Sequence, residues 1–107
     1  MGILSNRVAL VTGGGRGIGR AIALAYAAAG ADVAITSRTA GELDKVVKEI
    51  EAHGVRGLAV VADAMSYEDS QRAVKTVVDK LGAIHILFNN AGGVAGVIGN
   101  DAGTAGV

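Results

Sequence analysis

The sequence predicts an α/β fold in which helices cover both faces of a parallel sheet, and three observations support this class. Hydrophobic residues make up 50% of the 107 residues but aromatic residues only 3%, so the core is aliphatic, as in sheets covered by helices. Three short aliphatic runs are each followed by a stretch with helical spacing, and a fourth run ends the series. A glycine-rich segment follows the first run.

The first unit consists of a strand, a glycine loop and a helix. Residues 7–12 form an unbroken β-rich run of the kind that is buried on both faces of a parallel sheet. From Ile18 onward, apolar residues recur at spacings of three and four, which predicts a helix, and Gly30 ends this pattern.

The second unit begins with a strand at residues 32–37. Thr39 and Glu42 fit a capping box, in which Thr39 is the N-cap of the next helix and the Glu42 side chain reaches back to it. That helix has one apolar stripe and a charged opposite side, and it closes at His53 and Gly54.

The third unit repeats this order and leads into a fourth strand. Residues 57–62 form a strand ending at Asp63, and residues 66–69 resemble a second capping box, whose helix stops at Gly82. Residues 84–88 form the fourth strand, which delivers residues 89–92, Asn-Asn-Ala-Gly, at its carboxyl end.

The alternation of strands and helices also predicts the topology. Right-handed crossovers give a parallel sheet in three layers, and a Rossmann-like arrangement places its strands in the order 3-2-1-4. The loops after the first and fourth strands then flank the switch point, so the glycine loop should face residues 89–92. Residues 1–92 form this truncated domain, and the glycine-rich residues 93–107, which lack periodicity, are expected to be a mobile tail.

Composition excludes several function classes. Ten basic residues balance ten acidic ones without a basic block, so nucleic acid is not an expected partner. Cysteine is absent, which excludes disulfides and thiolate chemistry. The longest apolar run, residues 21–31, is too short to cross a bilayer, and residues 7–11 do not lead to a signal-peptide cleavage site. We therefore expect a cytoplasmic protein without a membrane partner.

The glycine loop carries the sharpest functional signal. Backbone that passes close to a pyrophosphate cannot carry side chains, and the N-terminus of the following helix supplies N–H donors. Neither G-x-G-x-x-G nor the Walker pattern fits, because Ile18 and Arg20-Ala21 stand where those patterns need other residues. The loop matches T-G-x-x-x-G-x-G instead, at Thr12, Gly13, Gly17 and Gly19. A merely tight strand-to-helix turn is the structural alternative.

These motifs resemble the N-terminal half of the short-chain dehydrogenase/reductase family. Residues 12–19 match its cofactor motif, Asp63 stands where its third strand ends in Asp, and residues 89–92 match its N-N-A-G motif, so the resemblance covers residues 7–92. It implies contacts to the pyrophosphate and its ribose from Gly13, Gly17, Ile18 and Gly19, to adenine from Asp63 and Ala64, and to the adenosine side from Asn90, Ala91 and Gly92. Alternatively, Asp63 only begins a loop, and the two asparagines only form a turn.

Charge after the second strand favours NADP(H) over NAD(H). An NAD site places an acid there for the ribose 2′-OH, whereas this chain has Ser37 and Arg38 and no acid before Glu42. Arg16 and Arg38 are expected to flank a 2′-phosphate, and Ser37 to donate a hydrogen bond to it. With Thr12 and Gly15, these residues complete the predicted cofactor site. Solvated surface arginines are the alternative.

The catalytic residues that the resemblance implies are absent from this chain. In the family a Tyr exchanges the proton while hydride moves between nicotinamide and substrate, assisted by a Lys four residues on and a Ser. Here Tyr26 is followed at that spacing by Gly30 and Tyr67 by Gln71. No metal site is expected from the isolated histidines.

We therefore expect the NADP(H)-binding portion of a short-chain oxidoreductase that interconverts a carbonyl and a secondary alcohol and is inactive alone. A non-catalytic dinucleotide-binding module and a self-associating fragment remain alternatives. The second alternative follows from the fourth strand, where Ile84, Ile86 and Phe88 would leave an exposed apolar edge that invites association.

Overall fold

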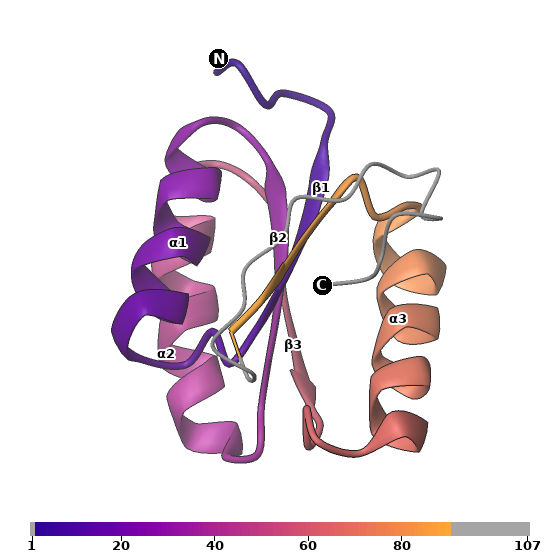
Figure 1. The fold of residues 1–107 in the computed structure, drawn as a ribbon. Coiled ribbons are helices and arrows are strands. Elements are labelled where there is room, and N and C mark those ends of the chain that lie inside the picture. Colours follow the sequence, from indigo (N-terminus) through magenta and orange to yellow (C-terminus); the bar gives the residue numbers. More distant parts are fainter. Residues whose placement is uncertain (1, 91–107) are drawn as a thin grey trace.

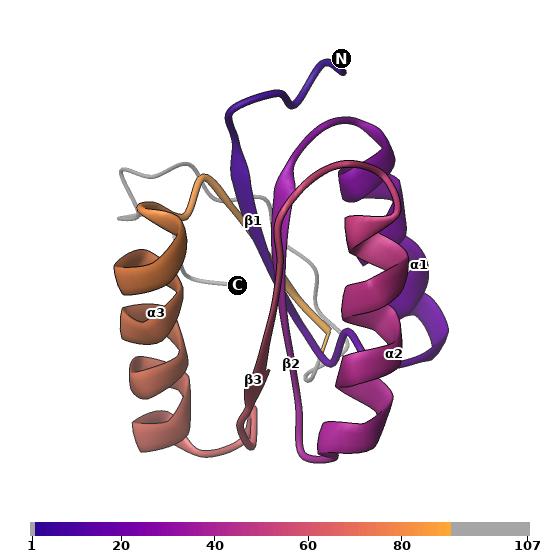
Figure 2. The ribbon, with the colours of Figure 1, turned by 180° about the vertical axis from the view of Figure 1, so that it is seen from behind.

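A four-stranded parallel sheet in the order β3-β2-β1-β4 forms the centre of the structure, a computed structural model that describes residues 2–90. Helices α1 and α2 cover one face and α3 covers the other, as Figures 1 and 2 show from opposite sides. The predicted class and strand order are confirmed. The elements are β1 (Val8–Thr12), α1 (Gly17–Ala28), β2 (Asp32–Ser37), α2 (Ala40–Glu51), β3 (Gly57–Val61), α3 (Tyr67–Leu81) and β4 (Ile86–Asn89).

The register of the strands aligns their carboxyl ends at one edge of the sheet. β1 pairs with β2 so that Thr12 lies opposite Thr36, and with β4 so that Thr12 lies opposite Asn89. Because all the strands run the same way, the segments that follow them emerge together, at the lower edge in Figure 1. This edge carries the glycine loop between β1 and α1 and the loop between β3 and α3.

Two aliphatic clusters hold the layers together, one on each face of the sheet. Successive side chains of a strand point to opposite faces, so Val11 joins the cluster under α1 and α2 while Leu10 joins the cluster under α3. Residues Val8 to Val11 are all buried for this reason. The unbroken apolar run that predicted β1 is thus explained by helices on both faces.

Of the two predicted capping boxes, one forms in part and one does not. At α3 the Ser66 hydroxyl accepts a hydrogen bond from the Asp69 N–H at 3.2 Å, as predicted, although the Asp69 carboxylate accepts from the Asp63 N–H instead of reaching back to Ser66. At α2, Thr39 is the N-cap, but its side chain makes no capping hydrogen bond. Glu42 does not reach back because it pairs with Arg16 across the glycine loop.

The fourth strand begins two residues later than predicted, at Ile86, because the side chain of His85 replaces part of the ladder. The His85 Nδ1 accepts a hydrogen bond from the Val8 backbone N–H at 2.9 Å, while the backbone N–H of His85 donates to the Val8 carbonyl at 2.8 Å. His85 therefore connects the first and fourth strands. The side chains of Ile84, Ile86 and Phe88 are half-buried, so they are less exposed than expected, although β4 is still a terminal strand of the described sheet.

Within the described part of the chain, no helix is both long and apolar enough to span a membrane. The predicted tail at residues 93–107 lies outside the described residues.

Candidate functional site

A cleft of about 520 Å³ opens at the carboxyl edge of the sheet. It is lined by Gly13, Gly15, Arg16, Gly17, Ile18, Thr36, Ser37, Arg38, Thr39, Glu42, Ala62, Asp63, Ala64, Met65 and Asn90. Every described residue of the predicted cofactor site is in this group except Thr12 and Gly19. Ala91 and Gly92, which were also predicted, lie outside the described residues. The fold thus brings together segments up to some eighty positions apart in the sequence.

Thr12, the last residue of β1, connects the start of the glycine loop to the end of β4 through hydrogen bonds of its side chain. Its hydroxyl donates to Asn89 Oδ1 at 2.9 Å and accepts from the Asn90 N–H at 3.0 Å. Gly13 of the glycine loop also lies beside Asn90, so the loop and the first residue after β4 are neighbours, as the topology predicted. Thr12 itself supports the site and is not among the lining residues.

Gly19 also acts from outside the cleft, by letting α1 approach the strand end. A Cβ at this position would lie 2.0 Å from the carbonyl oxygen of Gly13, a separation that atoms do not adopt. Gly13 and Gly17 are required for a different reason, because their φ angles of +69° and +61° are left-handed. The glycine motif is therefore required for two reasons. Gly13 and Gly17 adopt left-handed φ angles, and Gly19 allows a close contact between backbone segments.

The N-terminus of α1 is open toward the cleft. Arg16 is the N-cap with an extended backbone, no side chain caps it, and the first turn holds no acidic residue. By contrast, α3 has a Ser66 cap and two acids, Glu68 and Asp69, in its first turn. Free N–H groups and the positive end of the helix dipole make such a terminus suitable for an anion. Ile18 in this turn is 68% exposed and also lines the cleft.

Charged side chains of both signs gather where β2 ends. Arg16 Nη1 lies 3.7 Å from Glu42 Oε2, and the Arg16 side chain is 85% exposed. Among residues 2–90, Arg38 has no ion-pair partner. The Ser37 hydroxyl accepts a hydrogen bond from the Thr39 N–H at 3.0 Å and donates a long one to the Thr39 carbonyl oxygen at 3.5 Å.

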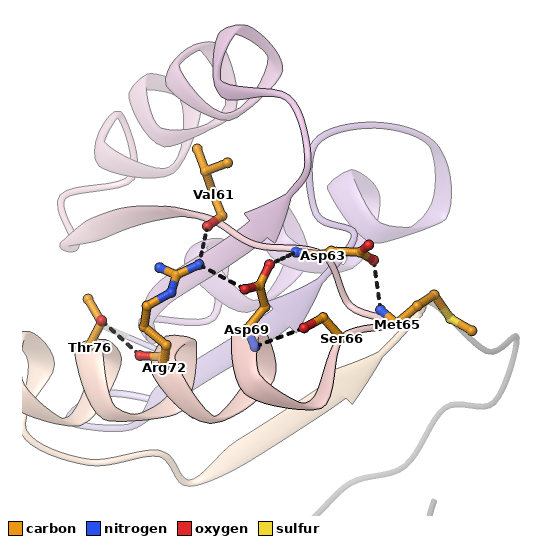
Figure 3. Close-up of polar contacts among 7 residues, drawn as sticks. All are labelled: Val61, Asp63, Met65, Ser66, Asp69, Arg72 and Thr76. Carbon is orange, nitrogen blue, oxygen red and sulfur yellow. Dashed lines mark hydrogen bonds and ion pairs between the residues drawn. The ribbon is translucent and has the colours of Figure 1, made fainter.

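The loop between β3 and α3, which forms the opposite wall, is held by the polar network in Figure 3. Asp63 Oδ1 accepts from the Met65 N–H at 2.9 Å, and the Asp63 N–H donates to Asp69 Oδ2 at 2.8 Å. Arg72 pairs with Asp69 at 3.6 Å and donates to the Val61 carbonyl at 2.9 Å. Asp63 thus forms its own loop and lines the cleft, so the two interpretations of this residue are compatible.

Sequence reasoning missed five lining residues: Thr36, Thr39, Glu42, Ala62 and Met65. Most of them flank predicted residues on the same loops, so adjacency alone could have indicated them. Glu42 is different, because it was assigned to a capping box. Its position in the first turn of α2 could have indicated a lining residue, because a side chain there points back toward the sheet edge that carries the glycine loop.

The two tyrosines stand away from the cleft. Tyr26 packs against the core beneath α1, and burial raises the pKa of its hydroxyl. Tyr67 is 76% exposed, and its hydroxyl accepts a hydrogen bond from Gln71 at 2.8 Å. Within residues 2–90 there is also no group of His, Cys, Asp or Glu that could hold a metal ion.

A parallel sheet of order 3-2-1-4, with a glycine loop and an open helix N-terminus at its switch point, defines a Rossmann-like nucleotide-binding domain. Residues 7–104 match the family model described as short chain dehydrogenase, and the chain belongs to this family.

Individual relatives agree with this assignment. An uncharacterised oxidoreductase of Mycobacterium tuberculosis is 49% identical over 90 residues, which cover 84% of this chain and 34% of the relative. The crystal structure of a short-chain dehydrogenase from Burkholderia cenocepacia in complex with NADP is 48% identical, with a TM-score of 0.79 over 82% of this chain and 36% of that one. NAD⁺-bound xylitol dehydrogenase is 36% identical, with a TM-score of 0.80 over 83% of this chain and 34% of that one.

The chain spans about a third of the length of the curated relatives that it matches. It aligns with similar scores to one structure that holds NADP and to one that holds NAD⁺. Likeness of fold therefore does not choose between the two dinucleotides.

Proposed function

We propose that this chain binds a nicotinamide dinucleotide, NADP(H) in preference to NAD(H), as the cofactor-binding portion of a short-chain oxidoreductase that interconverts a carbonyl and a secondary alcohol. The observation that carries the proposal is the cleft at the switch point, into which the uncapped N-terminus of α1 opens between glycines. An anion such as a pyrophosphate fits this environment.

The lining residues fit the parts of a dinucleotide. Gly13, Gly17 and Ile18 would lie along the pyrophosphate, and Asp63 and Ala64 would lie beside adenine in the opposite wall. Asn90 would contact the adenosine side, as would Ala91 and Gly92 beyond the described residues.

Preference for a 2′-phosphate rests on the arginines at the end of β2. Arg38 lines the cleft without an ion-pair partner in residues 2–90, and Arg16 stands on the facing loop. A guanidinium binds phosphate through paired N–H donors and stays charged at any relevant pH. Ser37 would contribute its hydroxyl by giving up its weak contact to the Thr39 carbonyl.

A bound nicotinamide would supply the hydride chemistry of the whole enzyme. The residues of this chain would bind and orient the cofactor, but the sequence holds no Tyr-x-x-x-Lys to exchange a proton with a substrate oxygen. We therefore propose that the 107 residues alone bind the dinucleotide without turnover.

The first prediction tests cofactor binding and its preference together. In a fluorescence titration, NADPH should bind saturably, and Arg38→Glu should weaken NADPH binding about ten- to a hundredfold while changing NADH binding little, because only the 2′-phosphate loses a charged partner. Arg7→Glu, the same charge reversal at the amino end of β1 and outside the cleft, is the matched control. Absence of saturable binding at millimolar cofactor would contradict the proposal.

Self-association is a second candidate property, favoured by the position of β4. This strand is a terminal strand of the sheet and pairs with β1 on one side. An unpaired strand edge offers backbone donors and acceptors to a second chain.

A further inference from the structure

Glu42 places a carboxylate inside the cleft, at the end expected to hold the ribose. It lies in the first turn of α2 and lines the cleft together with Ser37 and Arg38. A Cβ built on Gly15 would be 3.1 Å from Glu42 Cβ, 3.3 Å from its Oε1 and 3.6 Å from Ser37 Cβ. The missing side chain at Gly15 thus allows Glu42 to pack directly against the glycine loop.

The partner of Glu42 in this position is an arginine that the proposed function assigns to the ligand. Its Oε2 lies 3.7 Å from Arg16 Nη1, and both side chains are accessible to solvent. The charged lining residues are therefore two arginines, Arg16 and Arg38, against two acids, Glu42 and Asp63. The electrostatic potential that a 2′-phosphate would meet at this end of the cleft therefore depends on the acids as well as on the two arginines.

From this arrangement we infer that Glu42 is a specificity-determining residue, which competes with the ligand's 2′-phosphate for Arg16 and so limits the preference for NADP(H). The inference rests on the proposed function. An ionised carboxylate has no proton to donate to a phosphate, and it repels a second anion brought to the same guanidinium. For NADP(H) to gain Arg16, the Arg16–Glu42 pair must open.

A ligand with a free 2′-OH meets a different environment. A hydroxyl can donate to a carboxylate, so NAD(H) gains nothing when Glu42 loses its charge. Glu42 thus acts in the opposite direction to Arg38, and removing its charge should change the ratio of the two affinities.

The experiment compares Glu42→Gln with the unchanged chain of 107 residues. NADPH and NADH are titrated separately by fluorescence, and adenosine 2′,5′-bisphosphate and adenosine 5′-monophosphate are used as competitors that isolate the 2′-phosphate. We expect the NADPH-to-NADH affinity ratio to rise about three- to tenfold at low salt and by less at high salt, where exposed charges are screened. The bisphosphate should gain by the same factor and the monophosphate should not.

Two further variants make the test specific. Glu51→Gln makes the same change near the far end of α2, outside the cleft, and should leave the ratio unchanged. In an Arg16→Gln background the gain from Glu42→Gln should shrink, because the contested partner has been removed. Circular dichroism confirms that each variant retains its helices, and Glu42→Ala repeats the comparison with a second side chain.

Each outcome separates the inference from the function on which it rests. If NADPH binds but Glu42→Gln leaves the ratio unchanged, or if the gain is undiminished without Arg16, the inference fails and the proposed function stands. If neither dinucleotide binds to any of the variants, the proposed function fails and this inference fails with it.

Discussion

Single glycines determine how the glycine loop joins α1, and Gly19, in the first turn of that helix, has very little space for a side chain. Its place in the first turn of α1 puts it against the carbonyl oxygen of Gly13, at a distance that no side chain can share. The constraint is one of backbone against backbone, so it cannot be relieved by a change of rotamer. Helix and strand end must separate if any side chain is added there.

Gly19→Ala is therefore expected to lower the free energy of unfolding by about 1–3 kcal/mol, the usual range for overpacking, and to weaken dinucleotide binding as well. Urea denaturation measures the first effect and titration the second. Gly41→Ala is the matched control, because Gly41 lies in the first turn of α2 with nothing within 4 Å of the added Cβ. It should stabilise the chain slightly, by about 0.5–1 kcal/mol, since Ala favours a helix over Gly. Equal stability of the two variants would refute this account.

Residue-level predictions from the sequence succeeded where the interaction was local and failed where a distant partner competed. The Ser66 cap spans three positions, so its pattern is visible in the sequence. The Glu42 carboxylate had the same local pattern, but Arg16, brought close by the fold, takes it instead. No spacing rule reveals that competition, because it depends on how α2 lies against the glycine loop.

Entire elements were more predictable than their ends. Each helix has an apolar stripe that the sequence displays directly, and the glycines at positions 30, 54 and 82 have left-handed φ angles that end or follow helices. The start of β4 was misplaced because His85 supplies a side-chain acceptor to Val8, which requires knowledge of the register between the two strands. Likewise, the facing of the glycine loop and Asn90 followed from topology, but the Thr12 hydroxyl that joins them did not.

The packing of α1 against α2 includes an ion pair whose strength depends on pH. Arg20 Nε donates to Glu49 Oε1 at 2.9 Å, and a second hydrogen bond joins Arg20 Nη2 to Glu49 Oε2. These hydrogen bonds lower the pKa of the Glu49 carboxyl and raise the pKa of Arg20. A carboxyl with a lowered folded-state pKa stabilises the fold at neutral pH, and this contribution is lost as the pH falls from the unfolded-state pKa through the folded-state pKa.

We accordingly predict that stability declines as the pH is lowered from about 7 to below about 4, where carboxyl groups take up protons, and that Glu49→Gln removes part of this decline. The effect is small because the pair is exposed to solvent. Urea midpoints at several pH values measure it. Glu51→Gln, a neighbouring acid that forms no ion pair within residues 2–90, should retain the full decline. The same pH dependence in both variants would show that Arg20 and Glu49 are not coupled in solution.

At the scale of the whole molecule, the main feature is that the terminal strand of the sheet, β4, leads directly into the cleft at Asn90. β4 pairs with β1 on one side, and its residues 86–89 are only half-buried. The chain spans about a third of the length of its curated relatives, yet it contains the complete switch point. Within residues 2–90, the cleft and a strand edge that pairs with no further strand therefore lie in one small domain, and any association through β4 would occur beside Asn90.

We predict that the 107 residues associate with increasing concentration, and that β4 is the contact. Sedimentation velocity over a concentration series should show a rising mean sedimentation coefficient. Ile86→Lys should abolish the rise, because a charged side chain on an edge strand opposes pairing with another chain. Val78→Lys makes a similar change outside β4, on α3 at a residue with 42% exposure, and should leave association intact. A clean monomer at the highest concentration would exclude self-association, and loss of association with Val78→Lys alone would assign the contact to α3.

Because β4 also carries Asn89 and leads into Asn90, association through this strand should depend on whether NADPH is bound, whereas a contact through α3 should not.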